Sequence, residues 1–595
     1  MRIKHFFGLA VLAAMTASCS SNNDLVVGGG NGSGENESGA SYASITIDLP
    51  TTSGTRAAND KFDGGTASEY AVNDATLVIF KKGTATSEND YQYVETASLG
   101  NLEPWKKDKT TDNGITTEAT ITAELKQASV GEGGDYYALV ILNNKYDDDN
   151  KDKVSMPSST DTYGTWNAAT TVKKLIDYKK GFYMANAPEF KAVDQEPTTL
   201  VPIKGIYRTK EEAHSKPGTT VHVERGLAKV TVGKGTGNDY FSGAKASGSK
   251  YSKDDVKITN WALDVTNKSS FPVHVTAGLK DGVTSAGIPA YANIWKNEVA
   301  TPGTIAATSR FVSQLSATGA FKRVYWGIDP NYSMGLTDLT KCKEQFTLVK
   351  ADGSDAVWKT STEPLYCLEN TFDIKNMTQG QTTRVLLKAT YTPNALASET
   401  ETDKTFFMIG NSSDIWTTTT LKAQIASKAK DALSITTDPT VELTGDLLTA
   451  GTHVLTKSNV SIKIKEGETE KEKVDDDLVA KLNTKLGLDA TKGLGIKTYK
   501  NGESYYIARI KHFGDDLTPW SAGNDTYKEN NLNWLGRYGV LRNNWYDLTI
   551  EKISGPGYPD VPKVKPGDPD DEDTKYINVS VKILDWAKRS QSIDL

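Results

Sequence analysis

The chain has 595 residues, of which 37% are hydrophobic, and a formal net charge of −7. At roughly 100–200 residues per domain, this length allows two to four domains, each able to bury a core. The small acidic charge argues against a basic surface for phosphate contacts, and no RNA- or DNA-binding motif is present. We therefore expect no nucleic acid among the partners.

The N-terminus is typical of an export signal. Basic residues and a histidine at positions 2, 4 and 5 precede an apolar run over residues 6–15, which is too short for a permanent transmembrane helix. The segment Thr16-Ala17-Ser18-Cys19 follows, and small residues before a cysteine favour a lipoprotein signal over residues 1–18 with lipid on Cys19. Position −3 is Thr rather than the usual Leu, so an ordinary secretory signal with an incidental cysteine is the alternative.

A first strand is expected soon after this signal. Residues 20–39 are rich in Gly, Asn and Ser and predict a flexible tether. In the segment 41–50, Ala43, Ile45, Ile47 and Leu49 alternate with polar or small residues, as in a half-buried strand. The composition of residues 51–65 predicts an exposed loop.

Short strands are then predicted along most of the chain. They are rich in β-branched and aromatic residues and are separated by Gly, Asn, Asp or Pro: residues 74–80, 136–142, 221–232, 256–265, 384–391, 406–409 and 505–510. One short amphipathic helix is indicated by Leu478, Leu482 and Leu486. This pattern favours antiparallel β-sandwiches over a parallel βαβ sheet.

The C-terminus repeats the arrangement of the N-terminus. Residues 555–575 are rich in proline and acidic side chains and predict an extended, solvated linker. In the segment 576–586, Ile577, Val579, Val581 and Ile583 alternate with polar residues, which predicts a second half-buried strand.

Two similar strands at opposite ends suggest exchange. If the first strand were removed, it would leave an apolar groove and an unpaired sheet edge, and the last strand of a neighbouring copy could fill both. Such head-to-tail contacts do not close, so they build a filament. Four buried aliphatic side chains would contribute about 6–12 kcal/mol before ordering costs. The alternative is that both strands simply pair within their own chain.

Arg56 supports removal of the first strand. It is the first Lys or Arg after Lys4, so a trypsin-like protease acting on the precursor would first meet the bond between Arg56 and Ala57. Cleavage there would release the strand together with the lipid. Loops often contain basic residues, so an incidental arginine is the competing interpretation.

Signals for catalysis or metal binding are weak. The six histidines form no helical pair, and neither a GxSxG motif nor a Walker A loop is present. The acidic run over residues 146–152 lacks the glycine and terminal Glu of a calcium loop, which favours a solvated turn. Cys342 and Cys367 could form a disulfide or remain two buried thiols. We expect no enzyme, no cofactor and no metal site.

Several segments resemble the Bacteroidales fimbrillins, or type V pilins, and within them the branch of minor-fimbria major subunits. The first strand followed by TTSGTR-AA resembles the family's removable strand and processing site. Other similar segments, in chain order, are VHVERGLAKVTV, WALDVTNKSSFPV, YCLENT, YYIARIKHF, YGVLRNNWYDLTI and the terminal NVSVKILDW…IDL.

The resemblance implies two transthyretin-like β-sandwich domains with a few short helices. It also implies a precursor anchored to the outer membrane by lipid on Cys19, and an Arg-specific trypsin-like protease cutting at Arg56-Ala57. A C-terminal donor strand would use Ile577, Val579, Val581 and Ile583, with Trp586 at its end.

The expected organisation is a signal peptide, a propeptide with the first strand, two sandwich domains, a linker and a donor strand: residues 1–18, 19–56, 57–228, 229–554, 555–575 and 576–595. The expected function is that of a structural subunit of a cell-surface fimbria, which supports adhesion and polymerises head-to-tail with its own copies, beside anchor and tip subunits. The alternatives are a tip or accessory adhesive pilin, or a monomeric surface lipoprotein that binds glycans.

Overall fold

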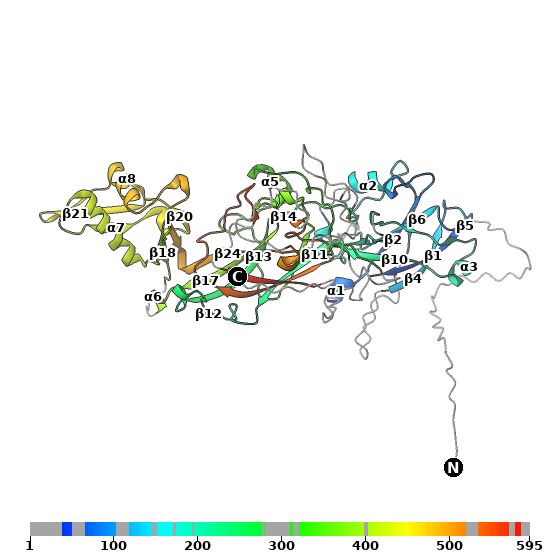
Figure 1. The fold of residues 1–595 in the computed structure, drawn as a ribbon, viewed down its shortest axis with the longest axis horizontal. Coiled ribbons are helices and arrows are strands. Elements are labelled where there is room, and N and C mark those ends of the chain that lie inside the picture. The colour runs from blue at the N-terminus through cyan, green and yellow to red at the C-terminus, as the bar shows by residue number, and fades with distance from the viewer. Residues whose placement is uncertain are drawn as a thin grey trace, which may run out of the picture. The chain divides into compact units, whose positions relative to one another are not determined.

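Strands dominate the part of the chain that the computed structural model describes (Figure 1). This part comprises residues 39–49, 66–100, 102, 118–145, 151–169, 174–192, 195–276, 279, 310–312, 321–397, 403–518 and 534–570, together with the backbone of residues 577–584. The all-β fold class predicted from the sequence is confirmed.

The N-terminal half of the chain forms an 8-stranded sheet in the order β3-β2-β6-β7-β10-β1-β4, with β8 paired to β6. The sheet contributes to one apolar core, in which β1, β2, β6 and β10 have fully buried side chains. Its strands are β1 Ser41–Asp48, β2 Ala75–Lys81, β3 Gln92–Ser98, β4 Glu118–Leu125, β6 Tyr136–Leu142, β7 Met184–Asn186, β8 Val201–Pro202 and β10 Thr219–Arg225, with a separate pair β5 Gly131–Glu132 and β9 Gly205–Ile206. The short helices are α1 Ala67–Tyr70, α2 Tyr163–Ala169 and α3 Lys210–Ser215.

The C-terminal half is a sandwich of two 4-stranded sheets, β16-β11-β25-β26 and β12-β13-β17-β24. Apolar side chains of β11 and β25 on one sheet and of β13, β17 and β24 on the other share one core. The bounds are β11 Leu227–Lys234, β12 Ala244–Lys245, β13 Asp255–Asp264, β16 Leu365–Leu368, β17 Arg384–Thr392, β24 Glu503–Arg509, β25 Trp545–Ile553 and β26 Ile577–Leu584. Smaller elements are β14 Thr266–Asn267, β15 Phe346–Thr347, α5 Leu339–Gln345, α6 Asn394–Ala397 and α9 Gly514–Leu517.

A helix-containing segment with its own core lies between β17 and β24 in the sequence. It is built from β18 Phe406–Ile409, α7 Thr418–Leu433, β19 Thr440–Leu443, β20 Gly451–His453, β21 Val460–Glu466, β22 Thr469–Glu472, α8 Asp476–Lys485 and β23 Ile496–Tyr499 (Figure 1). Alternate residues of β18 enter different cores. Phe406 and Met408 belong to the sandwich core, whereas Phe407 and Ile409 belong to the core under α7 and α8.

All seven strands predicted between residues 74 and 510 are present, most within two residues of the expected ends. Residues 221–232 were predicted as one strand but form parts of two, β10 and β11, which Gly226 separates. The helix expected around Leu478 is α8. Helix α7, whose buried face consists of Leu421, Ile425 and two alanines, was not predicted.

Residues 555–570 differ from the expected solvated linker. The side chains of Tyr499 and Tyr506 donate hydrogen bonds to the carbonyls of Gly557 and Gly555, at 2.7 and 2.9 Å. Further along, Asp570 is fully buried and forms an ion pair with Arg509 at 3.1 Å. This part of the Pro-rich segment is therefore held against the C-terminal sandwich.

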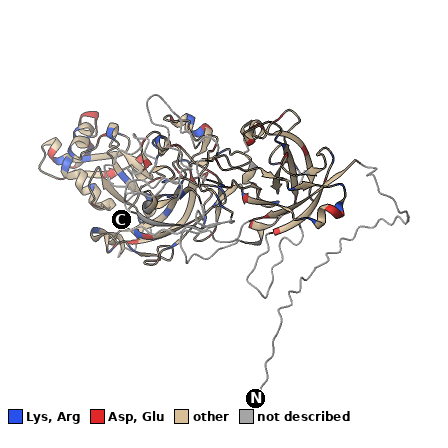
Figure 2. Cartoon of the chain, turned by 45° about the vertical axis from the view of Figure 1, so that its right-hand side comes forward, with Lys and Arg blue, Asp and Glu red and all other residues tan. Residues whose placement is uncertain are grey.

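Acidic and basic residues are intermingled along the described chain and do not gather on one basic face (Figure 2). No helix among the described residues is both long and apolar enough to cross a membrane. The same residues contain no cluster of three or more His, Cys, Asp or Glu side chains arranged for a metal ion.

Candidate functional site

Strand β1 lies inside a sheet, between β10 and β4 (Figure 1). It pairs antiparallel with β4 over its whole length, from Ser41 opposite Leu125 to Asp48 opposite Glu118. On its other side it pairs in parallel with β10, from Ile45 opposite Thr219 to Asp48 opposite His222. In the described residues β4 has no other strand partner in this sheet, so loss of β1 would leave β4 and half of β10 unpaired.

The apolar stripe predicted for β1 faces the core of the N-terminal half. Ala43, Ile45 and Ile47 are completely buried, and Leu49 is 3% exposed. Their neighbours include the buried Ala119 and Ala123 of β4 and Val221 of β10. These side chains would form the floor and walls of an apolar groove if β1 were absent.

Polar contacts fix the register of β1. The Ser41 hydroxyl donates to the carbonyl of Ala128 at 2.7 Å, and the hydroxyls of Thr46 and Thr120 are 2.9 Å apart. At the end of the strand, the Nδ1 atom of His222 is 3.0 Å from the Oδ2 atom of Asp48. A one-residue slip would break all three contacts and turn the apolar stripe away from the core.

Strand β26 occupies an edge position instead. It pairs antiparallel with β25 and has no strand partner on its other side among the described residues. Its residues 577, 579, 581 and 583 stand opposite Ile553, Ile550, Leu548 and Tyr546, all of which are buried in the sandwich core. The predicted donor strand thus rests on its own subunit in this structure, where it is held on one side only.

A buried charge cluster lies where β10 continues into β11. Glu69, on α1, is fully buried, and its carboxylate is 2.9 Å from Nζ of Lys229 and accepts a 2.6 Å hydrogen bond from the Tyr366 hydroxyl. Burial alone would raise the pKa of Glu69, but the hydrogen bond and charge of Lys229 hold it below its usual value. Arg225 donates to the backbone carbonyl of Glu69 at 2.7 Å. The chain just after the predicted processing site is therefore fixed to both β10 and β11.

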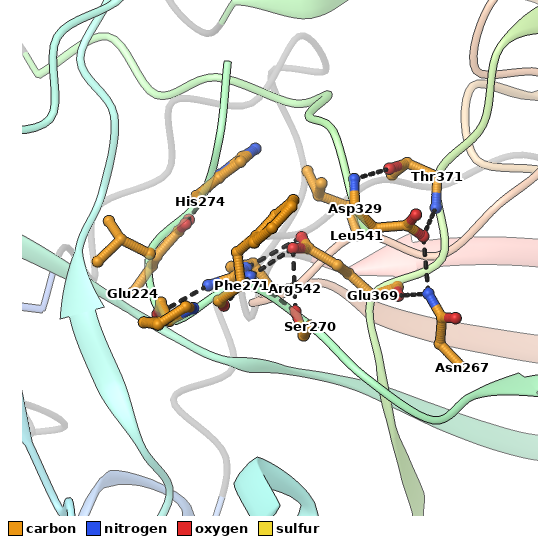
Figure 3. A network of polar contacts seen from close by, with 12 residues as sticks. Glu224, Asn267, Ser270, Phe271, His274, Asp329, Glu369, Thr371, Leu541 and Arg542 are labelled. Carbon is orange, nitrogen blue, oxygen red and sulfur yellow. Dashed lines mark hydrogen bonds and ion pairs between the residues drawn. The ribbon is translucent and has the colours of Figure 1, made fainter. Parts of the chain in front are cut away.

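A second buried network continues from this cluster (Figure 3). Glu224 of β10 is 2.9 Å from Nδ1 of His274 and 3.7 Å from the guanidinium of Arg323. Arg323 in turn donates to the carbonyls of Arg542 and Asn543, each at 3.2 Å. Strand β10 is thereby linked to the loop that leads into β25.

Arg542 anchors the other side of this network. Figure 3 shows it directed at Glu369, to which its Nε donates at 2.9 Å, and at the hydroxyl of Ser270, also at 2.9 Å. Burial alone would raise the pKa of Glu369, but the charge of Arg542 and its hydrogen bonds hold this pKa below its usual value. Nearby, burial raises the pKa of Asp329 to about 8, and its carboxylate accepts from Asn267 and from the Thr371 backbone.

Several predicted site residues lie outside the described residues: Cys19, Arg56, Ala57 and Trp586. Of the donor residues Ile577, Val579, Val581 and Ile583, the structure describes the backbone and its pairing. The two cysteines, left open by the sequence, are free thiols buried in different clusters. Strands β4 and β10 were not predicted as the neighbours of β1, because strand pairing depends on contacts distant in sequence.

Comparisons with known proteins give one match to a family model. Residues 497–592 match the C-terminal model of "Major fimbrial subunit protein type IV, Fimbrillin". This match covers β24, β25 and β26. No curated protein sequence matches the chain.

Three solved structures align with most of this chain, at low similarity. A proposed cell adhesion protein from Parabacteroides distasonis ATCC 8503 has 10% identity and a TM-score of 0.35, covering 92% of this chain and 98% of that one. A proposed cell adhesion protein from Bacteroides eggerthii DSM 20697 has 11% identity and a TM-score of 0.30, covering 93% and 98%. The tip fimbrial protein Mfa3 from Porphyromonas gingivalis has 10% identity and a TM-score of 0.27, covering 92% and 100%.

At these TM-scores, the assignment rests on the family model and on the strands that it covers. The resemblance predicted from the sequence is confirmed where the family model applies, because residues 497–592 are similar to the C-terminal region of fimbrillins.

Proposed function

We propose that this chain is a structural subunit of a cell-surface fimbria that polymerises by exchange of its terminal strands. The observation that carries the proposal is the contrast between β1 and β26. Strand β1 fills a groove and pairs with a strand on each side, whereas β26 pairs with one strand, β25, at a sheet edge. Both strands carry apolar residues at four alternate positions, 43 to 49 and 577 to 583.

This contrast gives the exchange a driving force. A donor strand that leaves β25 and enters the groove of another copy exchanges one hydrogen-bonded edge for two, along β10 and β4. Its four aliphatic side chains contribute about 6–12 kcal/mol on burial before ordering costs. The cost includes the uncovered edge of β25, so the net gain is smaller than this sum.

Proteolysis is needed because β1 belongs to the same chain as its groove. A tethered strand acts at an effective concentration of about millimolar, which a donor from another molecule must outcompete. Cleavage at Arg56-Ala57 removes this advantage and lets β1 leave. The ion pair between Glu69 and Lys229 keeps the segment that follows the cleavage site attached to β11.

The precursor passes through two stages before assembly. Lipid on Cys19 anchors it to the outer membrane until an Arg-specific trypsin-like protease cuts at Arg56-Ala57 and releases the lipid with β1. The mature subunit then joins copies of itself and the anchor and tip subunits of the fimbria. Residues 57–228 and 229–554 are its two sandwich domains, with the donor strand in 576–595.

A role in the stalk is favoured over a role at the tip. A tip subunit has no need to donate a strand onward, whereas β26 forms a complete strand of eight residues with an alternating apolar pattern. A monomeric glycan-binding lipoprotein would have no use for such a strand either.

The test uses the purified precursor and two variants, Arg56→Ala and a chain truncated after residue 575. Limited trypsin treatment of the parent is expected to cut first at Arg56 and to yield ladders on SDS gels without boiling. The Arg56→Ala variant should form no ladder at a trypsin dose that cuts only this site. The truncated chain should be cut, stay folded and remain monomeric. Normal filaments from the truncated chain would refute the assignment of the donor strand.

A further inference from the structure

Two strand pairs depart from the antiparallel pattern of this fold. Among the described ladders, only β1 with β10 and β11 with β25 are parallel. The second pair joins residues 229–234 to residues 545–550, which are separated by more than 300 positions in the chain. It thereby closes a loop that contains most of the C-terminal half of the protein.

Strands β10 and β11 form one almost continuous structure. Only Gly226 separates them, and a Cβ atom at this position would lie 3.0 Å from the ring of Tyr183. The junction is braced by Arg225, which bonds the Glu69 carbonyl at 2.7 Å and Asn543 at 3.3 Å, and by the contact of Glu224 with His274. The strand that lines the groove therefore passes directly into the strand that pairs with β25.

Resting on the strand-exchange function proposed above, we infer that the β11–β25 pair is a mechanical clamp that carries tension through the subunit. In a filament under load, tension enters through the groove and reaches β11 at its amino end, Leu227. It leaves through the donor strand, which follows β25 in the chain, so it reaches β25 at its carboxyl end, Ile553. The two strands are parallel, and they are therefore pulled at opposite ends.

This geometry loads the pair in shear. Strands pulled at opposite ends must lose all their hydrogen bonds together, whereas strands pulled at the same end lose them one after another. Side-chain contacts between β11 and β25 also resist sliding of one strand along the other. The Thr231 hydroxyl donates to Asp547 at 2.7 Å and accepts from the Trp545 indole at 2.7 Å, and Nζ of Lys229 lies 3.8 Å from the Trp545 ring.

The arrangement protects the rest of the domain. Once residues 555–570 have been pulled off the C-terminal sandwich, residues 235–544 lie outside the path of the force for as long as the pair holds. If it breaks, pulling between residues 216 and 552 would release a length of about 120 nm, at up to ~3.6 Å per residue. Residues 555–570, held by Arg509 and the tyrosines of β23 and β24, form a first restraint between the donor strand and β25.

Single-molecule force spectroscopy on the full monomeric chain tests the clamp. Azide-bearing residues placed at two exposed positions serve as handles, which avoids reaction of the two buried cysteines. Handles at Lys216 and Lys552 pull β11 and β25 from opposite ends. Handles at Asn238 and Lys552 pull the same strands from the same end. The first geometry should require a several-fold higher rupture force than the second.

A matched pair of variants identifies the resisting element. Val232 on β11 and Val385 on β17 are both fully buried in the same core. Val232→Ala should lower the rupture force between handles 216 and 552, whereas Val385→Ala should leave it unchanged while destabilising the protein in denaturant to a similar degree. Equal forces in the two pulling geometries, or equal effects of the two variants, would overturn the clamp.

Because the measurement uses single monomers, it does not depend on polymerisation. A weak clamp in a chain that still forms filaments would refute this inference alone. A strong clamp in a chain that never polymerises would refute the proposed function instead.

Discussion

Buried charged side chains concentrate where β10 runs into β11. Glu69, Glu224, Arg225 and Lys229 are each no more than 5% exposed. Burying a charge is costly unless a partner of opposite charge and further hydrogen bonds compensate. Glu69 and Lys229 pair with each other, Glu224 lies beside His274 and Arg323, and Arg225 donates to the Glu69 carbonyl and to Asn543. These partners come from segments far apart in the sequence. The cluster therefore fixes the geometry of the junction more than it adds stability.

Glu69→Gln is expected to lower the free energy of unfolding by roughly 3–5 kcal/mol, because it leaves the ammonium group of Lys229 buried without its counter-charge. Denaturation in urea measures the loss. The double variant Glu69→Gln/Lys229→Met removes both charges and should recover much of it. A double variant as unstable as the single one would show that the charge of Lys229 is not the cause.

Asp329 predicts a pH dependence of stability. Its pKa is raised to about 8 in the folded protein, chiefly by burial, against about 3.9 in an unfolded chain. The folded state thus binds the proton more tightly than the unfolded state. Its stabilising contribution is complete below pH ~4 and is lost as the pH rises through about 8.

Between pH 5 and pH 8, the free energy of unfolding should therefore fall by up to about 1.4 kcal/mol per pH unit. Asp329→Asn, which stays uncharged, should show a flatter profile over this range in urea denaturation experiments. Parallel profiles for the parent and the variant would contradict the assignment.

Alternating apolar residues predicted individual elements well. The periods of two in residues 41–50 and 577–583 predicted β1 and β26, and the fully apolar run of β6 was placed at its observed ends. Strand pairing could not be derived in this way. The parallel neighbours of β1 and β25 are set by contacts across hundreds of residues, which no local pattern encodes.

Two elements were misjudged for physical reasons. Helix α7 begins with threonines, and half of its buried face is alanine, so this apolar face is too weak to stand out in the sequence. The composition of residues 555–570 is typical of a linker. Their burial depends on hydroxyls of Tyr499 and Tyr506 and on Arg509, none of which can be associated with this segment from sequence alone.

The alternation in β26 predicts which of its faces drives assembly. Val581→Asp places a charge in the apolar stripe and should abolish polymerisation of the cleaved subunit, because burying a carboxylate in the apolar groove lined by Val221 is costly. Ser580→Asp places the same charge on the other face and should leave assembly largely intact. Light scattering after trypsin treatment measures both. Equal inhibition by the two substitutions would mean that charge, not groove packing, controls assembly.

On the scale of the whole molecule, the described features fit one subunit of the proposed filament. A groove filled by β1 lies in one half, a detachable edge strand lies in the other, and β10 with β11 runs between them. Under the proposed function, a subunit built in this way is stored in a closed form and is then joined to others. In this cycle, β1 must leave before a neighbouring strand can enter.

A reversible lock on β1 tests this claim most directly. Thr46 and Thr120 are register partners with hydroxyls 2.9 Å apart, a geometry suited to a disulfide in Thr46→Cys/Thr120→Cys. After cleavage at Arg56, the oxidised variant should remain monomeric in analytical ultracentrifugation. Addition of a reductant should release the β1 peptide and start polymerisation. Filaments that form while the disulfide is intact, or a subunit that releases β1 and still does not polymerise, would contradict the account.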